Sequence, residues 1–176
     1  MKTAWVTAKR TVELLDREYR KPGPGEVSVR IKACGLCGTD LHFFRDYPSG
    51  SPGAGEPTPL GHEVAGLVRE TGPGVEDLVP GTEAIVQNNV FCGMCEACLN
   101  GRTRFCRNIR TYMNDRAGLA EYLTVDRRMV VPYQGLDFPS AALAEPLTVA
   151  LDVVREAELE PGQRVCVSGP GIIGLF

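Results

Sequence analysis

Four of the seven cysteines fall within fifteen consecutive residues. Their order is Cys92-x2-Cys95-x2-Cys98-x7-Cys106. Zinc favours four thiolates at tetrahedral corners, and a shell closed in this way leaves no place for water. An iron–sulfur cluster is the rival, but its ferredoxin-type run places the fourth cysteine three residues on and follows it with proline. Here Arg107 follows, so the pattern favours a structural zinc ion over iron or free thiols.

A second, sparser set of metal-binding side chains is spread over the chain. Cys37 begins Cys-Gly-Thr-Asp-Leu-His, the histidine being His42; Gly-His-Glu at 61–63 supplies His62 and Glu63, and Glu145 comes much later. The chain has two histidines, and both lie in these motifs. One thiolate, one imidazole and one carboxylate would bind zinc and leave the fourth position open, as catalysis requires. Each motif alone is a weak signal.

Short strands separated by turns must position these residues. Residues 26–33 alternate, with Val27, Val29 and Ile31 on one face and polar side chains on the other, which predicts a half-buried strand. Further strands are expected at 3–8, 63–70, 82–88, 120–125 and 129–131, and a surface loop is expected at 46–59. The pattern predicts a mainly β protein, an antiparallel barrel or sandwich.

The pattern changes after Ser140, which could cap a short helix, with Pro146 opening the next one. Residues 164–168 then predict a strand that leads into a glycine-rich turn with Gly169, Gly171 and Gly174. A strand followed by this turn is typical of dinucleotide binding. We therefore divide the chain into a zinc-binding domain, residues 1–150, and the start of a nucleotide-binding domain, residues 151–176.

Composition restricts the class of protein. The formal net charge of −3 gives no electrostatic case for binding nucleic acid or an anionic membrane. No apolar run is long enough to span a bilayer, and the first residues lack a signal peptide. The many cysteines suit metal binding in a reducing compartment, so we expect a cytoplasmic protein. Cys34 and Cys166 are expected to be small core residues.

The motifs, in this order along nearly the whole chain, resemble the medium-chain zinc-dependent alcohol dehydrogenase family. The resemblance implies a GroES-like β-barrel, then the first strand and glycine turn of a Rossmann domain. It implies that Cys37 and His62 bind a catalytic zinc, with Glu145 as the third protein ligand and Glu63 as a carboxylate that can exchange with water. Glu145 stands where ethanol-type members have cysteine, as in members that act on polyols, sugars or threonine. Asp40 would orient the imidazole, Thr39 would accept the substrate's proton and His42 would pass it on.

This resemblance implies an oxidoreductase with one catalytic and one structural zinc, which transfers hydride between a secondary alcohol or polyol and NAD or NADP. Its partners would be a small alcohol or carbonyl substrate and, as in family members, further copies of the chain. The glycine turn lies close to Phe176, so we expect a truncated chain that binds nicotinamide weakly or not at all. Residues beyond about 155 are expected to be poorly ordered or packed in an unusual way. The alternative is a zinc-binding GroES-like scaffold without catalysis.

Overall fold

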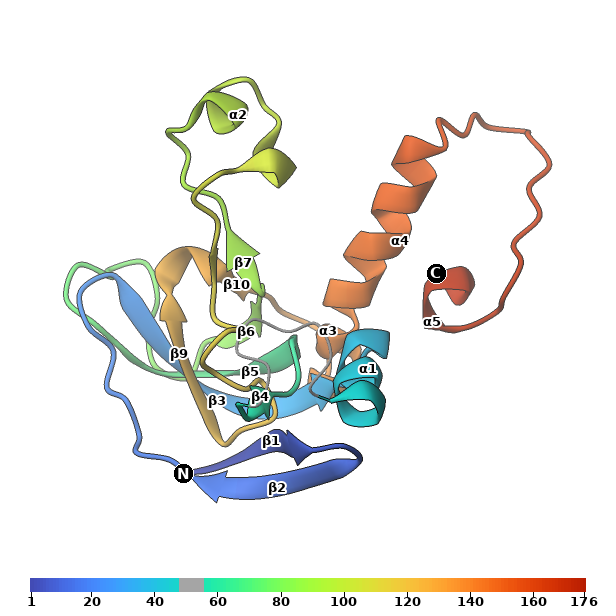
Figure 1. The fold of residues 1–176 in the computed structure, drawn as a ribbon. Helices are drawn as coiled ribbons and strands as arrows, with labels where there is room; N and C mark the ends of the chain where they lie inside the picture. The colour runs from blue at the N-terminus through green and yellow to red at the C-terminus, as the bar shows by residue number, and fades with distance from the viewer. Residues whose placement is uncertain (48–55) are drawn as a thin grey trace.

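The computed structural model describes residues 1–47 and 56–176, so most of the predicted loop 46–59 lies outside the described residues. The main layer is a curled antiparallel sheet of five strands in the order β10-β6-β5-β3-β9 (Figure 1). The strands are β3 (Glu26–Gly35), β5 (Glu63–Thr71), β6 (Glu83–Val86), β9 (Tyr122–Asp126) and β10 (Val130–Pro132). All five were predicted as strands, with ends that differ by a few residues. The sheet forms half of a barrel, and the mainly β prediction is confirmed.

A smaller antiparallel sheet closes one side, in the order β2-β1-β4. Its strands are β1 (Lys2–Ala8), β2 (Thr11–Asp16) and β4 (Thr58–Pro59). An isolated bridge between Thr3 and Ala120 joins it to the segment before β9. Strand β2 was not predicted, because it lies at a sheet edge with nearly every side chain exposed and therefore lacks an apolar alternation.

The cysteine lobe (residues 92–106) projects away from the sheets on a two-stranded hairpin (Figure 1). The hairpin consists of β7 (Asn89–Val90) and β8 (Arg110–Thr111), and the lobe holds α2 (Glu96–Leu99) and the 3-10 turn η1 (Thr103–Phe105). A second 3-10 turn, η2 (Arg127–Met129), separates β9 from β10. The lobe is therefore a local structure set apart from the main core.

The main core is formed by the five-stranded sheet and includes the alternating apolar residues of its strands. Val27 and Val29 of β3 are fully buried, as are Val64 of β5 and Val86 of β6. Ser28 is also fully buried, although the alternation placed it on the polar face. Its hydroxyl lies 2.9 Å from the hydroxyl of Tyr19, which covers that face of the strand. Both faces of β3 are thus covered at this point.

The helices begin at different residues from those predicted. Asp137, not Ser140, caps α3 (Phe138–Ala142) by accepting a hydrogen bond from the Ser140 N–H. The longer α4 (Ala144–Glu156) starts two residues before Pro146, since proline is tolerated anywhere in a first turn, where N–H groups have no partner. A further helix, α1 (Gly38–Asp46), follows β3 directly and was not predicted.

Residues 164–168 form no strand, which corrects the sequence prediction. A strand needs a neighbour for its backbone hydrogen bonds, and in the part of the chain that the structure describes none lies beside this segment. Val165 and Val167 are exposed, and so is Cys166, which corrects its expected place in the core. The chain continues through an open loop to α5 (Ile172–Leu175) (Figure 1). Every residue from 151 to 173 is exposed. No helix among the described residues is long and apolar enough to cross a membrane.

Candidate metal centres

The cysteine lobe brings its four sulfur atoms together. One sulfur atom from each of Cys92, Cys95, Cys98 and Cys106 lies within 4.8 Å of the others. The Sγ atoms of Cys95 and Cys98 are 3.4 Å apart, and those of Cys92 and Cys98 are 3.9 Å apart. Four sulfur atoms at tetrahedral zinc–sulfur distances would be separated by about 3.8 Å. The described geometry therefore fits a zinc ion.

Backbone amides favour the thiolate form of two of the four lobe cysteines, as the lowered pKa values of these two show. The N–H of Cys98 lowers the pKa of Cys95 to about 6, and the N–H of Met94 lowers the pKa of Cys92. Burial raises the pKa of Cys98 to about 12. The N–H of Cys92 donates to the Cys106 sulfur at 3.2 Å. Such a cluster of thiolates repels itself unless a cation lies between them.

Cys37 lies at the junction of β3 and α1. Its sulfur accepts a hydrogen bond from the Thr39 N–H at 3.1 Å, and its own N–H donates to the Asp40 carboxylate at 3.0 Å. Cys37 is thus the N-cap of α1. A helix N-terminus favours negative charge, so this position suits a thiolate ligand.

The Asp40 carboxylate, which accepts from Cys37, also lies beside His62. Asp40 is buried, and its Oδ1 accepts a hydrogen bond from the Gly61 N–H at 2.8 Å. Its Oδ2 lies 3.9 Å from Nδ1 of His62. One ligand atom from each of Cys37, Asp40 and His62 lies within 4.8 Å of the others. Asp40 therefore connects two segments that are far apart in the sequence.

Two glycines allow this close approach. Gly61 has a φ of +85°, and a Cβ there would lie 2.6 Å from the Cys34 sulfur. At Gly35 a Cβ would lie 1.9 Å from Oε2 of Glu63, the residue paired with Gly35 across β3 and β5. Burial raises the pKa of Cys34 to about 12, so this sulfur remains a neutral thiol.

Two carboxylates form a second group that shares His62 with the first. One atom from each of His62, Glu63 and Glu145 lies within 4.8 Å of the others. Burial raises the pKa of Glu63, and the negative charge of Glu145 raises it further. We call Cys37, His62, Glu63 and Glu145 the open site. Its sulfur, nitrogen and oxygen donors match the donor set of a zinc ion that keeps one coordination place free.

A cavity of about 520 Å³ opens at the open site. Thr39 and His42 also line it, and so do Ile172 and Ile173 of α5. The His42 side chain is 69% exposed, and its Nδ1 lies 3.3 Å from the Asp46 carboxylate. Every sequence-predicted ligand and proton-transfer residue thus lies at one of the two centres or at this cavity. No sequence pattern pointed to Asn88, whose side-chain amide lies 3.3 Å from the Glu145 carboxylate.

Gly169 and Gly171 of the predicted nucleotide turn are exposed, and Gly174 is half-buried. A Cβ at Gly174 would lie 2.3 Å from the carbonyl oxygen of Gly169, which has a φ of +97°. Gly171 forms the N-cap of α5 without a side-chain hydrogen bond. The turn is therefore tight, although the strand expected before it is missing.

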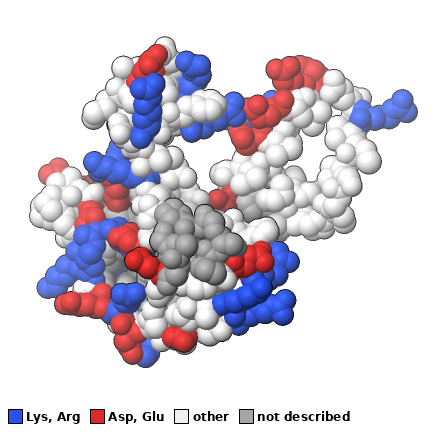
Figure 2. All heavy atoms as spheres, in the orientation of Figure 1, with Lys and Arg blue, Asp and Glu red and all other residues white. Residues whose placement is uncertain are grey.

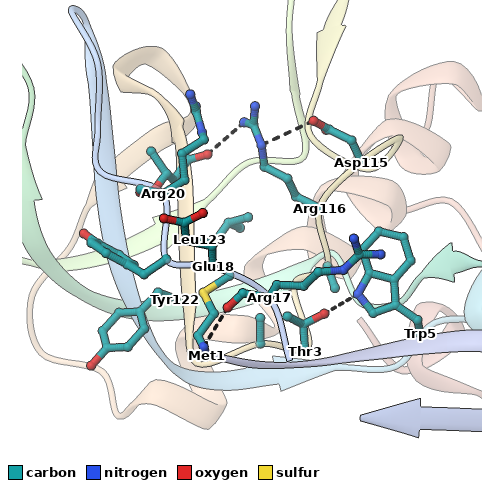
Figure 3. A pocket seen from close by; sticks show the side chains of 14 residues that line it. Met1, Thr3, Trp5, Arg17, Glu18, Arg20, Asp115, Arg116, Tyr122 and Leu123 are labelled. Carbon is teal, nitrogen blue, oxygen red and sulfur yellow. Dashed lines mark hydrogen bonds and ion pairs between the residues drawn. The ribbon is translucent and has the colours of Figure 1, made fainter. Parts of the chain in front are cut away.

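A second cavity, of about 250 Å³, lies near the N-terminus and contains none of the candidate ligands (Figure 3). The Arg17 guanidinium stacks 4.8 Å from the centre of the Trp5 ring. Arg116 donates to the carbonyl oxygen of Thr124 and pairs with Asp115 at 3.6 Å. The guanidinium groups of Arg17 and Arg116 therefore already have partners within the protein. On the face seen in Figure 2, acidic and basic side chains are interspersed.

Comparison with known proteins identifies relatives over the whole chain. The family described as the alcohol dehydrogenase GroES-like domain matches residues 23–135. L-galactonate-5-dehydrogenase of Escherichia coli (strain K12) is 38% identical over 160 residues, which cover 90% of this chain and 46% of that protein. The chain spans about half the length of the curated relatives it matches.

Solved structures share the fold. Galactitol-1-phosphate dehydrogenase from Escherichia coli superposes with a TM-score of 0.89 at 30% identity, covering 99% of this chain and 50% of that one. The cobalt- and zinc-bound thermostable alcohol dehydrogenase from Pyrobaculum aerophilum has a TM-score of 0.80 at 30% identity, with coverage of 98% and 54%. The GroES-like fold predicted from the motifs is thereby confirmed.

Proposed function

Because this chain belongs to the alcohol dehydrogenase GroES-like domain family, we propose that it is the metal-binding part of a zinc-dependent oxidoreductase. The protein would transfer hydride between a secondary alcohol or polyol and NAD or NADP. The observation that carries this proposal is the convergence of Cys37, His62 and the Glu63–Glu145 pair beside one cavity. The relatives named as dehydrogenases of sugar acids, threonine and sorbitol support the polyol class.

Zinc bound at the open site would act as a Lewis acid on the oxygen of the substrate. Cys37, His62 and Glu145 would hold the ion, and Asp40 would fix the ring of His62. Thr39 would accept the proton of the substrate hydroxyl, and the exposed His42 would pass it to solvent. A nicotinamide must take the hydride, because zinc has no redox chemistry. The turn with Gly169, Gly171 and Gly174 is the proposed contact with this cofactor.

The cysteine lobe would hold the second, structural zinc ion. We propose the division at residue 150, a cytoplasmic location and assembly with further copies of the chain as parts of the same interpretation. The free thiols of the described cysteines are consistent with a reducing compartment. A small alcohol or carbonyl compound would be the substrate.

Cobalt substitution tests the open site. With zinc loaded in the lobe, added Co²⁺ should bind a second site and give a thiolate-to-metal charge-transfer band. Addition of 2-propanol or imidazole should shift the cobalt spectrum, because one coordination place is free. Cys37→Ser should abolish the band while the lobe keeps its zinc. A cobalt spectrum that responds to neither probe contradicts an open site.

A scaffold without catalysis is the second candidate, favoured by the exposed segment at 164–168 that joins no sheet. Titration with NADH separates the two candidates. Enhanced or quenched nicotinamide fluorescence supports the enzyme. For this 176-residue chain the enzyme should bind NADH weakly and the scaffold should not bind it. Steady-state turnover at a rate typical of a dehydrogenase would contradict weak binding.

A further inference from the structure

Glu145 is held from outside the open site by a side chain that neither the motifs nor the family resemblance identifies. Its Oε1 accepts a hydrogen bond of 3.3 Å from Nδ2 of Asn88, in the loop between β6 and β7. Glu145 also lines a separate cavity of about 480 Å³, together with Asn88 and Asn89. Glu145 thus borders two cavities, and its carboxylate has a donor from the loop between β6 and β7.

The chemistry of the groups sets the direction of this contact. An ionised carboxylate only accepts hydrogen bonds, so Asn88 must turn its NH2 group towards Glu145. Its Oδ1 then faces Asn89, whose Nδ2 donates to it at 2.6 Å. The two asparagines therefore form a one-way chain of hydrogen bonds that ends on the carboxylate.

The base of this chain is anchored in the hairpin that carries the cysteine lobe. The carbonyl oxygen of Asn88 accepts a bond of 2.9 Å from the Thr111 hydroxyl in β8. Asn89 pairs with Thr111 across the hairpin, and its carbonyl oxygen accepts a bond of 2.7 Å from the Gln87 side chain. The asparagines consequently sit on fixed backbone rather than on a free loop.

We propose that Asn88, supported by Asn89, is a positioning residue that fixes the Glu145 carboxylate for the metal of the open site. The inference rests on the proposed function. A glutamate side chain loses considerable rotamer freedom when it binds a metal, and a donor that restricts it beforehand reduces this loss. Residues that hydrogen-bond to metal ligands typically change metal affinity by about 10- to 100-fold when they are removed.

The test is Co²⁺ affinity at the open site of the 176-residue chain, with zinc already in the lobe. Asn88→Leu keeps the approximate size of the side chain but removes the donor. We expect a roughly 10-fold weaker affinity for Co²⁺ and a changed cobalt spectrum. The control is Asn108→Ala, an exposed asparagine in the segment after the lobe, which should leave the affinity unchanged. Unchanged affinity in Asn88→Leu overturns the proposal.

A double-mutant cycle separates positioning from a general structural effect. If Asn88 acts through Glu145, Asn88→Leu should have no further effect on Co²⁺ affinity in a Glu145→Ala background. Additive losses overturn the proposal. If Asn88→Leu does not fold, Asn89→Ala removes the second link alone. A loss of about 3-fold in affinity is then expected, an intermediate effect for an indirect partner, and no loss overturns the proposal.

The cycle also distinguishes this inference from the proposed function. If the unsubstituted chain binds no Co²⁺ beyond the lobe, the open site itself is wrong. If it binds Co²⁺ and the Glu145→Ala variant binds equally well, Glu145 is not a ligand and Asn88 has nothing to position. If Glu145→Ala weakens binding but Asn88→Leu does not, the inference alone fails.

Discussion

The cysteine lobe and the open site reach the same kind of ion by opposite routes. All four donors of the lobe come from fifteen consecutive residues on a small hairpin. The donors of the open site come from the junction of β3 and α1, the start of β5 and the first turn of α4. A local site can take its shape from the metal, whereas a site assembled from distant segments needs a shape imposed by the protein. The open site accordingly has a buried hydrogen bond at Asp40 and glycines at two positions where a side chain would collide with its neighbours. In the lobe, a Cβ at Gly93 or Gly101 would meet nothing within 4 Å.

The largest expected effect is the loss of zinc from the lobe while the rest of the chain stays folded. Cys95→Ser removes one of four thiolates from the lobe, so zinc should fall by about one ion per chain, since a structural site depends on its full ligand set. The half-barrel should stay folded, because the main core lies outside the lobe. Metal analysis and circular dichroism measure both. Cys166→Ser, at an exposed cysteine outside both groups, is the control. Retention of both ions, or unfolding of the whole chain, would break the contrast drawn above.

Asp40→Ala should damage the open site and leave the lobe intact. The change removes the acceptor for the N–H groups of Cys37 and Gly61, which are left unpaired near the core. We expect a loss of about 3 kcal/mol in the free energy of unfolding and loss of the open-site metal. Urea denaturation and metal analysis check the two effects. Asp115→Ala, at an exposed side chain, is the matched control; equal losses in both variants would contradict the role of Asp40.

Gly35→Ala tests whether the open site depends on empty space. The new Cβ would overlap the Glu63 carboxylate, so we expect destabilisation of about 1–3 kcal/mol. Glu63→Ala in the same chain should relieve most of it. Gly38→Ala is the control, because a Cβ there meets nothing within 4 Å. Thermal unfolding of the parent chain, Gly35→Ala, Glu63→Ala and the double variant gives the coupling energy between the two positions. Additive effects would show that the Glu63 side chain does not obstruct the new Cβ.

The smallest effect concerns the junction between lobe and sheet. The Arg128 guanidinium holds the pKa of Asp126 below its usual range and also donates to the carbonyl oxygen of Phe91 at 3.2 Å. Because the folded pKa is depressed, this stabilisation is present above the unfolded pKa of about 3.9 and is lost as the pH falls through the folded value. Asp126→Asn should therefore cost about 1 kcal/mol or less at pH 7.

Denaturation midpoints at pH 7 and pH 3 measure that difference. The difference in denaturation midpoint between the parent chain and the Asp126→Asn variant should become smaller as the pH falls. Arg110→Gln, which removes a longer and more exposed partner of Asp126, should have a smaller effect. A gap that stays constant with pH would exclude the ionised carboxylate as its cause.

The sequence predicted what depends on local pattern. Alternation identified β3, a short run bounded by turn residues identified β5, and cysteine spacing identified the lobe, because all three signals lie within short windows. Strand β2 was missed because its side chains face solvent, and the strand at 164–168 was wrong because its apolar residues have no neighbouring strand among the described residues.

The two sites differ in the same respect. The family motifs identified the donor residues of the open site, but they did not identify the residues that hold those donors in place. Asn88 reaches Glu145 across 57 positions of the chain, and no periodicity connects the two. Gly35 and Gly61 lie beside the motif residues, yet only the packed structure shows which atoms would collide with a side chain at either position.

The lack of a side chain at Gly35, opposite Glu63, restricts how these two positions can vary in evolution. Positions 35 and 63 share one volume, so natural variation at one should depend on variation at the other. Sequences that keep a long acidic residue at 63 should keep glycine at 35, and those with a small residue at 63 are free to carry a methyl group at 35. Co-variation between these two columns in an alignment of relatives would record this shared space without any protein being made.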